Sequence, residues 1–351
     1  ICPDCKRKLE ELSETNFFFK LSKYQDWLTD YFKAHPDFVL PGFRYNEALS
    51  FITQQKLEDL CISRPKARMG WGIEVPFSKE HVTYVWFDAL INYISAAGFE
   101  SNAGKFKKFW PADVHFIGKD ILRQHAIYWP IMLRALDLEP PYRIAAHGWW
   151  LIGKSQEKMS KSKGNVIDPA EMVEKFGVDA YRYFLLRDVP FGLDGTFSES
   201  SIIKRYNSDL ANDLGNLVYR TLTMVEKYYS GAVPKALNLA PNSIIRNKIA
   251  ALSGEVEKFL QRFEFSAALE VIWGLINLAN KHVEETKPWN LAKENKTEEL
   301  KDFIALLVEV IKKVAEELSC FMPDTAQKIE KQFAKDKIIK GQPLFPRIDV
   351  N

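Results

Sequence analysis

Short apolar runs alternate with helical patterns before residue 150. The runs at residues 82–87, 114–118 and 144–150 are rich in β-branched and aromatic residues, which favour strands. Between them, residues 88–97 and 120–136 carry apolar positions at helical spacing. Because strand–helix–strand segments with right-handed crossovers pair in parallel, this order predicts the second half of a doubly wound, Rossmann-type α/β sheet.

The carboxyl ends of parallel strands are where such sheets bind their ligands. Gly118-Lys119-Asp120 follows one predicted strand, and His147-Gly148 lies at the end of another. An N-cap role for Asp120 in the following helix and a buried structural role for His147 are the competing explanations for these two side chains.

From about residue 200, the apolar positions follow long helical periods with few strand signals. Three stripes carry this pattern: Leu210, Leu214, Leu217 and Thr221; Phe259, Phe263, Leu269, Ile272, Trp273 and Ile276; and Phe303, Leu306, Leu307, Val310, Ile311, Val314 and Leu318. The pattern predicts an all-α bundle over residues 201–351.

The residues before the sheet predict a connective module. Phe17–Leu21 is typical of a short strand, and Ser22 of the cap of a helix that ends at His35-Pro36. A second helix is expected over residues 45–57, and residues 71–76 are expected to form a strand that approaches a turn.

Composition and charge limit the class of protein. The chain has 351 residues, 46% of them hydrophobic, and a net charge of only +2, so a nonspecific nucleic-acid coat is excluded and any RNA contact should be local. No apolar run reaches the roughly 18 residues of a membrane span, and no signal peptide is visible. We therefore expect a soluble, cytoplasmic protein with no membrane partner.

Two of the four cysteines form the motif Cys2-Pro3-Asp4-Cys5. Such a knuckle supplies two thiolate ligands, which is half of a structural Zn²⁺ site, and the other pair would have to lie upstream of Ile1. A metal-free turn with two reduced thiols is the alternative. Because the first residue is not methionine, we expect the chain to begin partway through a larger protein.

Three lysines alternate with small or polar residues in the segment Glu157-Lys158-Met159-Ser160-Lys161-Ser162-Lys163-Gly164-Asn165. Lysine ammonium groups and serine hydroxyls can converge on phosphate oxygens, and glycine lets the chain turn without a Cβ penalty. A solvated surface loop is the alternative, since most charge runs face water. The position of the loop after a predicted strand end favours contact with a bound nucleotide.

The segment Lys158-Met159-Ser160-Lys161-Ser162 resembles the second signature of class I aminoacyl-tRNA synthetases. In that class the loop grips the pyrophosphate of ATP. The resemblance therefore implies catalytic roles for Lys158 and Lys161, and ATP-binding roles for Met159, Ser160 and Ser162.

Three further stretches resemble methionyl-tRNA synthetases of the bacterial type. They are the Cys2–Cys5 knuckle that leads into Phe17–Tyr24, the run Tyr84–Leu90 with Tyr93, and Phe116–Arg123 with His125 and Trp129-Pro130. The resemblance covers essentially the whole chain. It implies residues 1–80 as the end of a zinc-knuckle insertion and the return to the catalytic domain, 81–150 as the second half of that domain, 151–200 as the lysine loop and stem-contact region, and 201–351 as the anticodon-binding bundle.

The methionine pocket of that family falls on seven residues of this chain: Val85, Trp86, Ala89, Tyr93, Ile121, His125 and Trp129. Aromatic walls pack well on a polarizable thioether, and a phenol or imidazole near the sulfur can separate methionine from leucine. Aromatic side chains that simply fill the core between sheet and helix are the alternative. The resemblance also implies nucleotide-binding roles for Gly118, Asp120, His147 and Gly148.

In the predicted bundle, residues 212–220 resemble the anticodon-reading helix of the family. Asn216 and Arg220 are four residues apart, so both can project toward unstacked bases. Trp289, after Lys287-Pro288, is a candidate stacking platform for an anticodon base, and interhelix packing is its alternative.

The expected function is that of a methionine–tRNA ligase whose partners are methionine, ATP with Mg²⁺, and tRNA(Met). The His-x-Gly-His first signature of class I is absent from this sequence. We therefore expect a missing N-terminal half of the catalytic domain, in the same polypeptide or in a separate chain, without which residues 1–351 are not competent. Gln124 also departs from the apolar or aromatic residue common there in the family.

Two rival functions remain open from the sequence. One is a class I synthetase for another amino acid, such as cysteine, valine or leucine. The other is a noncatalytic tRNA-binding or regulatory protein that kept the fold and lost the first signature.

Overall fold

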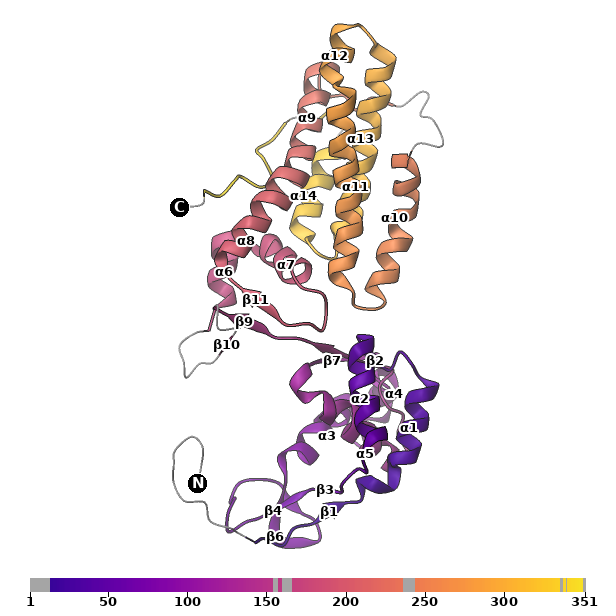
Figure 1. The fold of residues 1–351 in the computed structure, drawn as a ribbon, viewed down its shortest axis with the longest axis vertical. Coiled ribbons are helices and arrows are strands. Elements are labelled where there is room, and N and C mark those ends of the chain that lie inside the picture. Colours follow the sequence, from indigo (N-terminus) through magenta and orange to yellow (C-terminus); the bar gives the residue numbers. More distant parts are fainter. Residues whose placement is uncertain are drawn as a thin grey trace. The chain divides into compact units, whose positions relative to one another are not determined.

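Three parallel strands organise residues 1–147, the first of two compact units in this computed structural model. Strand β8 (Arg143–His147) lies between β7 (Val114–Gly118) and β2 (Val39–Leu40), and the two outer strands are labelled in Figure 1. Both pairings are parallel, and the carboxyl ends of β7 and β8 are level in the register. The predicted parallel strand–helix–strand arrangement is therefore confirmed.

The second unit covers residues 148–351. Across both units, the structure describes residues 13–153, 157–159, 166–235, 244–334, 337–338 and 340–349, with the backbone alone at 157 and 158. The predicted zinc ligands Cys2 and Cys5, and residues 160–165 of the lysine loop, lie outside the described residues.

Helices cover the sheet and close the main core of the first unit. Helices α1 (Gln25–Ala34) and α2 (Gly42–Gln54) pack with the helical segment that follows β7. The buried side chains that they share include Leu28, Phe32, Ile52, Ile117, Ala126 and Ile144. Since β2 and both helices belong to this core, the chain returns to the sheet well before residue 80.

The helix predicted over residues 120–136 is present but is not a regular α-helix. It begins with a 3₁₀ turn, η2 (Lys119–Ile121), continues through a π-helical turn, η3 (Gln124–Tyr128), and ends in α5 (Trp129–Ala135). The π turn holds one more residue per turn than an α-helix, and such turns are frequent at functional sites.

The strand predicted over residues 82–87 is wrong in its second half. Strand β6 (Ser78–Thr83) ends first, and α3 (Val85–Ala97) begins two residues later. Leu90 and Ile94 of α3 are fully buried in a second, smaller core, which α4 (Ala103–Phe109) also joins through Phe106. Burial of one helical face thus overrides the strand preference of the local sequence.

Ser22 does not cap α1, contrary to the prediction. Its hydroxyl donates to Asp59 Oδ1 at 2.6 Å, and the chain forms the 3₁₀ turn η1 (Leu21–Tyr24) before α1 begins. The partner of this serine lies 37 residues away, so its role could not be read from the local sequence.

Short antiparallel strands make up the rest of the first unit. Strand β1 (Phe18–Phe19) pairs with β3 (Leu60–Cys61). Strand β6 pairs with β4 (Ser63–Pro65) and β5 (Glu74–Val75), the last of which is shorter than the strand predicted over residues 71–76.

The strand predicted over residues 144–150 is divided between the two units. Strand β8 ends at His147, and β9 (Trp150–Ile152) starts a separate sheet with β10 (Glu157–Lys158) and β11 (Gly195–Phe197). An added Cβ at Gly148 would lie 2.0 Å from the carbonyl oxygen of Leu193, so the close backbone approach there requires glycine.

Long helices form the remainder of the second unit, and the predicted bundle is confirmed. They are α6 (Pro169–Phe176), α7 (Val178–Arg187), α8 (Glu199–Arg205), the π-helical η5 (Tyr206–Gly215), α9 (Asn216–Tyr229), α10 (Ile244–Leu260), α11 (Phe265–Thr286), α12 (Pro288–Lys293), α13 (Thr297–Leu318) and α14 (Pro323–Phe333). The predicted stripes are largely buried in one continuous core. Phe263 is an exception, because it lies in the turn between α10 and α11 with a φ of 60°.

Helix α7 holds the turn between α13 and α14. The buried carboxylate of Asp179 accepts from the backbone N–H of Thr325 at 2.6 Å, at the start of α14. The guanidinium of Arg182 donates to the carbonyl oxygens of Phe321 and Cys320, at 2.8 and 2.9 Å. One helix thus satisfies free backbone groups at both ends of the turn.

Replacing Asp179 by alanine should lower the free energy of unfolding of the second unit by about 2 kcal/mol, because a buried N–H loses its charged acceptor. Urea denaturation followed by circular dichroism measures the change. The matched control is Glu330→Ala on the exposed face of α14, which should shift the free energy by less than about 0.5 kcal/mol. Equal effects of the two substitutions would contradict the role given to Asp179.

Candidate functional site

The edge of the parallel sheet brings three predicted nucleotide-binding residues together. Gly118 and His147 are register partners at the carboxyl ends of β7 and β8. An added Cβ at Gly118 would lie 2.6 Å from Asp120 Oδ1 and 3.8 Å from His147 Cε1. Glycine therefore leaves the space that the Asp120 carboxylate occupies.

The N-cap role considered for Asp120 is wrong. Asp120 lies inside η2, whose N-cap residue is Gly118, and no side-chain hydrogen bond caps this turn. The side chain is exposed at the strand end. His147 is exposed as well, so a buried structural role for this histidine is also wrong.

Gly148 starts the second unit, where the backbone is held by its own contacts. The N–H of Trp149 donates to Asp194 Oδ1 at 2.9 Å, and Trp149 O accepts from the N–H of Gly195 at the same distance. Among the described residues of the lysine loop, Met159 packs against the hydrophobic core of the second unit.

A chain of hydrogen bonds joins three of the residues predicted to bind methionine. The hydroxyl of Tyr93 on α3 lies 2.8 Å from His125 Nε2, and His125 Nδ1 lies 2.9 Å from the carbonyl oxygen of Ile121. Trp129 follows His125 by four residues, and its ring centroid is 6.0 Å from that of Tyr93. The structure therefore gathers Tyr93, Ile121, His125 and Trp129 in one place.

Exposure differs widely across the seven predicted pocket residues. Val85 is 56% exposed, whereas His125 and Trp129 are only 2% and 0% exposed. The other four are partly buried: Trp86, Ala89, Tyr93 and Ile121. Trp129 thus fits the alternative of core packing, while Tyr93 and Ile121 remain accessible beside it.

Two aromatic residues of this cluster were missed by the sequence analysis. The ring of His115 lies 4.3 Å from that of Tyr93 at 76°, and Trp110 lies 6.2 Å from His115 and 5.9 Å from Trp129. Tyr93, His115, Trp110 and Trp129 form a closed circuit of rings. His115 alternates with Phe116 along β7, a period-two signal that could have placed it on the inner face.

Burial keeps the two histidines of the cluster neutral. It lowers the pKa of His115 to about 4, with a further contribution from neighbouring His125, and it lowers the pKa of His125. Burial also raises the pKa of Tyr93. The cluster therefore presents uncharged, polarizable groups, which suit an apolar ligand with a weak acceptor.

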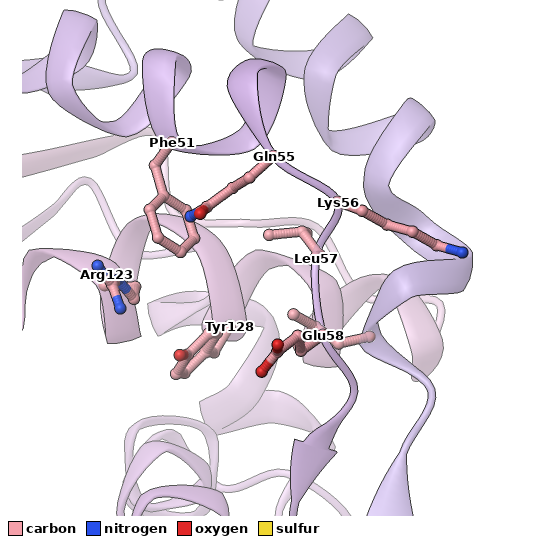
Figure 2. A pocket seen from close by; sticks show the side chains of 8 residues that line it. Phe51, Gln55, Lys56, Leu57, Glu58, Arg123 and Tyr128 are labelled. Carbon is pink, nitrogen blue, oxygen red and sulfur yellow. The ribbon is translucent and has the colours of Figure 1, made fainter.

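A cavity of about 520 Å³ is lined in part by the same helical segment. Figure 2 shows the side chains around it, among them Arg123, Tyr128 and Phe51. Its lining includes Arg123, whose guanidinium lies 4.0 Å from the ring centroid of Phe51, together with Tyr128 and the end of α2. Arg123 and Tyr128 are five residues apart, which is close to one turn of the π-helical segment, so both can face this cavity.

The predicted anticodon-binding residues lie on α9 and α12 of the bundle. Asn216 is exposed at the start of α9, and Trp289 on α12 is 40% exposed. Arg220 donates to Glu284 of α11 at 2.6 Å. Interhelix packing therefore does not fully bury Trp289, and the Arg220 guanidinium has a carboxylate partner within the bundle.

The described part of the chain offers neither a cluster of metal-ligating side chains nor a membrane-spanning helix. Within those residues, no group of three or more histidine, cysteine, aspartate or glutamate side chains is placed to hold a metal ion. No helix there is long and apolar enough to cross a bilayer.

Comparison with known families fits this geometry. The model of class I tRNA synthetases (M) matches residues 1–222, and the model of the anticodon-binding domain of tRNA ligases matches residues 242–350. The chain belongs to the class I methionyl-tRNA synthetase family. Its fold is accordingly the Rossmann-like catalytic domain of that class followed by a helical anticodon-binding domain.

Curated methionyl-tRNA synthetases align with nearly the whole chain. The methionine–tRNA ligases of Clostridium perfringens and Caldanaerobacter subterraneus are each 47% identical to it over 99% of its length. The chain spans about 57% of the length of these relatives.

Solved structures of the family share the fold. Methionyl-tRNA synthetase of Mycobacterium tuberculosis bound by methionyl-adenylate superposes with a TM-score of 0.86 at 38% identity, covering 95% of this chain and 69% of that one. A second structure of that enzyme, also in complex with methionyl-adenylate, gives 0.85 at 40% identity with the same coverage.

Lowering the pH should destabilise the first unit through His115. Its folded pKa of about 4 lies below the 6.5 of the unfolded chain, so only the unfolded chain takes up the proton between these values. The contribution of the neutral His115 ring to the free energy of unfolding is fully present above pH 6.5. It is lost as the pH falls toward 4, by on the order of 3 kcal/mol.

The substitution His115→Phe should remove this loss. The difference in unfolding free energy between variant and parent should grow in favour of the variant from pH 7 to pH 4, as measured by urea denaturation. His35→Phe, at an exposed histidine on the same unit, is the control. Parallel pH profiles for His115→Phe and the parent would contradict the assignment.

Proposed function

We propose that the protein is a methionine–tRNA ligase. It would activate methionine with ATP to methionyl-adenylate and transfer the methionyl group to the 3′-terminal ribose of tRNA(Met). The observation that carries the proposal is the neutral Tyr93–His125–Ile121 chain, held beside the strand ends of a methionyl class I fold. Because the chain spans only part of its relatives, the proposal concerns the whole protein.

Methionine would bind against the α3 face and the η3–α5 segment. The proposed contacts are Val85, Trp86, Ala89, Tyr93, Ile121, His125 and Trp129. The uncharged cluster offers polarizable rings to a thioether, and its hydroxyl and imidazole would distinguish sulfur from a methyl branch. Methionyl-adenylate bound in the Mycobacterium tuberculosis structures supports this ligand class.

ATP, entering with Mg²⁺, would bind at the strand ends. The Asp120 carboxylate can accept hydrogen bonds from ribose hydroxyls, beside Gly118 and His147. The resemblance to class I synthetases assigns further nucleotide-binding roles to Gly148 and to the loop residues Lys158, Met159, Ser160, Lys161 and Ser162. Lys158 and Lys161 would stabilise the negative charge that develops on pyrophosphate.

The chemistry requires positioning and electrostatic stabilisation. A methionine carboxylate oxygen attacks the α-phosphorus in line as the bond to pyrophosphate breaks, which yields the mixed anhydride. A hydroxyl of the terminal ribose then attacks the carbonyl carbon, and AMP leaves. No protein nucleophile takes part in either step.

The tRNA anticodon would bind the outer surface of α9 and α12. Trp289 offers a partly exposed ring for stacking, and Asn216 and Arg220 offer groups that can hydrogen-bond to base edges. RNA that engages Arg220 has to compete with Glu284 for its guanidinium. A structural Zn²⁺ on Cys2 and Cys5 is a further proposal, which rests on their spacing alone.

Methionine-dependent exchange of pyrophosphate into ATP, measured with the protein as the cell makes it, tests the function. We expect exchange with methionine and not with leucine, valine or cysteine. Lys161→Ala should slow exchange by a factor of about 100 without changing methionine affinity, and Lys312→Ala on exposed α13 should leave it unchanged. Absence of exchange, or faster exchange with another amino acid, would overturn the proposal.

Trp289→Ala should weaken charging of tRNA(Met) at subsaturating tRNA by roughly tenfold, the loss of one stacked base. Exchange should be unaffected, because this reaction needs no anticodon contact. Ile244→Ala, which truncates another exposed apolar side chain of the bundle, is the control for nonspecific effects. If exchange fell together with charging, Trp289 would be a folding residue instead.

A further inference from the structure

The tautomer of His125 follows from its two hydrogen-bond partners. The carbonyl oxygen of Ile121 can only accept, so His125 Nδ1, 2.9 Å away, carries the ring proton. The Nε2 atom of the neutral ring is then an acceptor, and the hydroxyl of Tyr93 donates to it at 2.8 Å. Methionine recognition therefore depends on where the Tyr93 ring is held.

The nearest aromatic ring to Tyr93 is that of His115. Their centroids are 4.3 Å apart at 76°, an edge-to-face pair, whereas His125 and Trp129 lie 5.7 and 6.0 Å from Tyr93. The ring of Trp110 also contacts His115, at a centroid distance of 6.2 Å. His115 is thus placed to fix the orientation of the Tyr93 ring.

A cavity explains why Tyr93 needs this support. About 510 Å³ of open space is lined by Tyr93 and His115 together, along with Ala96, Ala97 and Phe116. Without the imidazole, the Tyr93 ring has room to turn into this space, and its hydroxyl would then leave His125 Nε2. His115 lines this cavity with its ring 4.3 Å from that of Tyr93.

The imidazole of His115 is buried with one ring nitrogen unpaired within the part of the chain that the structure describes. It is 6% exposed, and its Nε2 atom has no hydrogen-bond partner among the described residues. A buried unpaired polar atom costs about 1 to 3 kcal/mol, so His115→Phe should remove this cost and keep a ring against Tyr93. Its electrostatic neutrality is consistent with a ring that supports Tyr93 without adding a charge.

We propose that His115 is a positioning residue for methionine recognition, which acts by wedging the Tyr93 ring against His125. The inference rests on the proposed function, because it takes Tyr93 and His125 as the groups that face the side chain of the amino acid. His115 itself needs no contact with methionine.

A double-mutant cycle in pyrophosphate exchange tests the proposal with the protein as the cell makes it. His115→Ala should raise the KM for methionine about fivefold to tenfold and lower the preference for methionine over leucine, with kcat and the KM for ATP within twofold of the parent. His115→Phe should restore the KM to within about threefold, because a ring again fills the wedge position.

The cycle with Tyr93 separates positioning from general stability. Tyr93→Phe removes the hydroxyl, so adding His115→Ala to it should cost little more than Tyr93→Phe alone. Additive losses, or an equal rise in the KM for ATP, would show that His115 acts only on the fold. A His115→Phe variant as impaired as His115→Ala would also overturn the wedge.

A spectroscopic measurement keeps this inference separate from the proposed function. In protein labelled with ¹⁵N-histidine, the Nε2 resonance of His125 should shift in His115→Ala toward the value in Tyr93→Phe, because both lose the tyrosine hydrogen bond. If exchange with methionine fails but this shift appears, the wedge stands and the substrate is wrong. If the His125 Nε2 resonance does not shift, the wedge is overturned, whatever the substrate.

Discussion

The hydrogen-bond chain from the Ile121 carbonyl through His125 to Tyr93 is the constraint on which the candidate site depends. It joins α3 to the helical segment after β7 and fixes which atoms can donate. This series of hydrogen bonds forms because Ile121 and His125 lie four residues apart where η2 passes into the π turn η3. Strand β7 then adds His115 from the sheet side, so Tyr93 is supported by the sheet as well as by the helical segment.

The same helical segment contributes both to the hydrogen-bonded cluster and to the cavity against α2. Ile121, His125 and Trp129 recur every four residues on one side, whereas Arg123 and Tyr128, five apart, line the cavity against α2. A regular α-helix would separate residues five apart by well over a quarter turn, and the π turn brings them nearer. The irregular segment, which the apolar pattern marked only as a helix, therefore carries much of the geometry.

The sequence predicted the elements whose signal is local. Strand β7 follows from its run of β-branched and aromatic residues, the parallel pairing from the strand–helix–strand order, and the bundle from the 3.6-residue period of the apolar positions. The predictions failed where contacts distant in the sequence decide the local structure. Ser22 binds Asp59 instead of capping α1, and burial of Leu90 and Ile94 makes a helix begin within a run that is typical of a strand. His115 was missed for the same reason, since nothing in β7 announces that Tyr93 packs on it.

For residues predicted from motifs, the sequence indicates the position but not all of the contacts. Gly118 and Asp120 are two residues apart in the sequence, so their proximity was foreseeable, but the close packing, in which an added Cβ at Gly118 would lie 2.6 Å from Asp120 Oδ1, appears only when the carboxylate is placed. Arg220 is a candidate anticodon contact because it lies four residues after Asn216 on α9. The structure adds a partner, Glu284, which is 64 residues away in the sequence. Since an exposed ion pair is worth at most about 1 kcal/mol, base contacts can displace it at little cost. The position of the Arg220 guanidinium in the bundle thus depends on a residue of α11 that no motif marks.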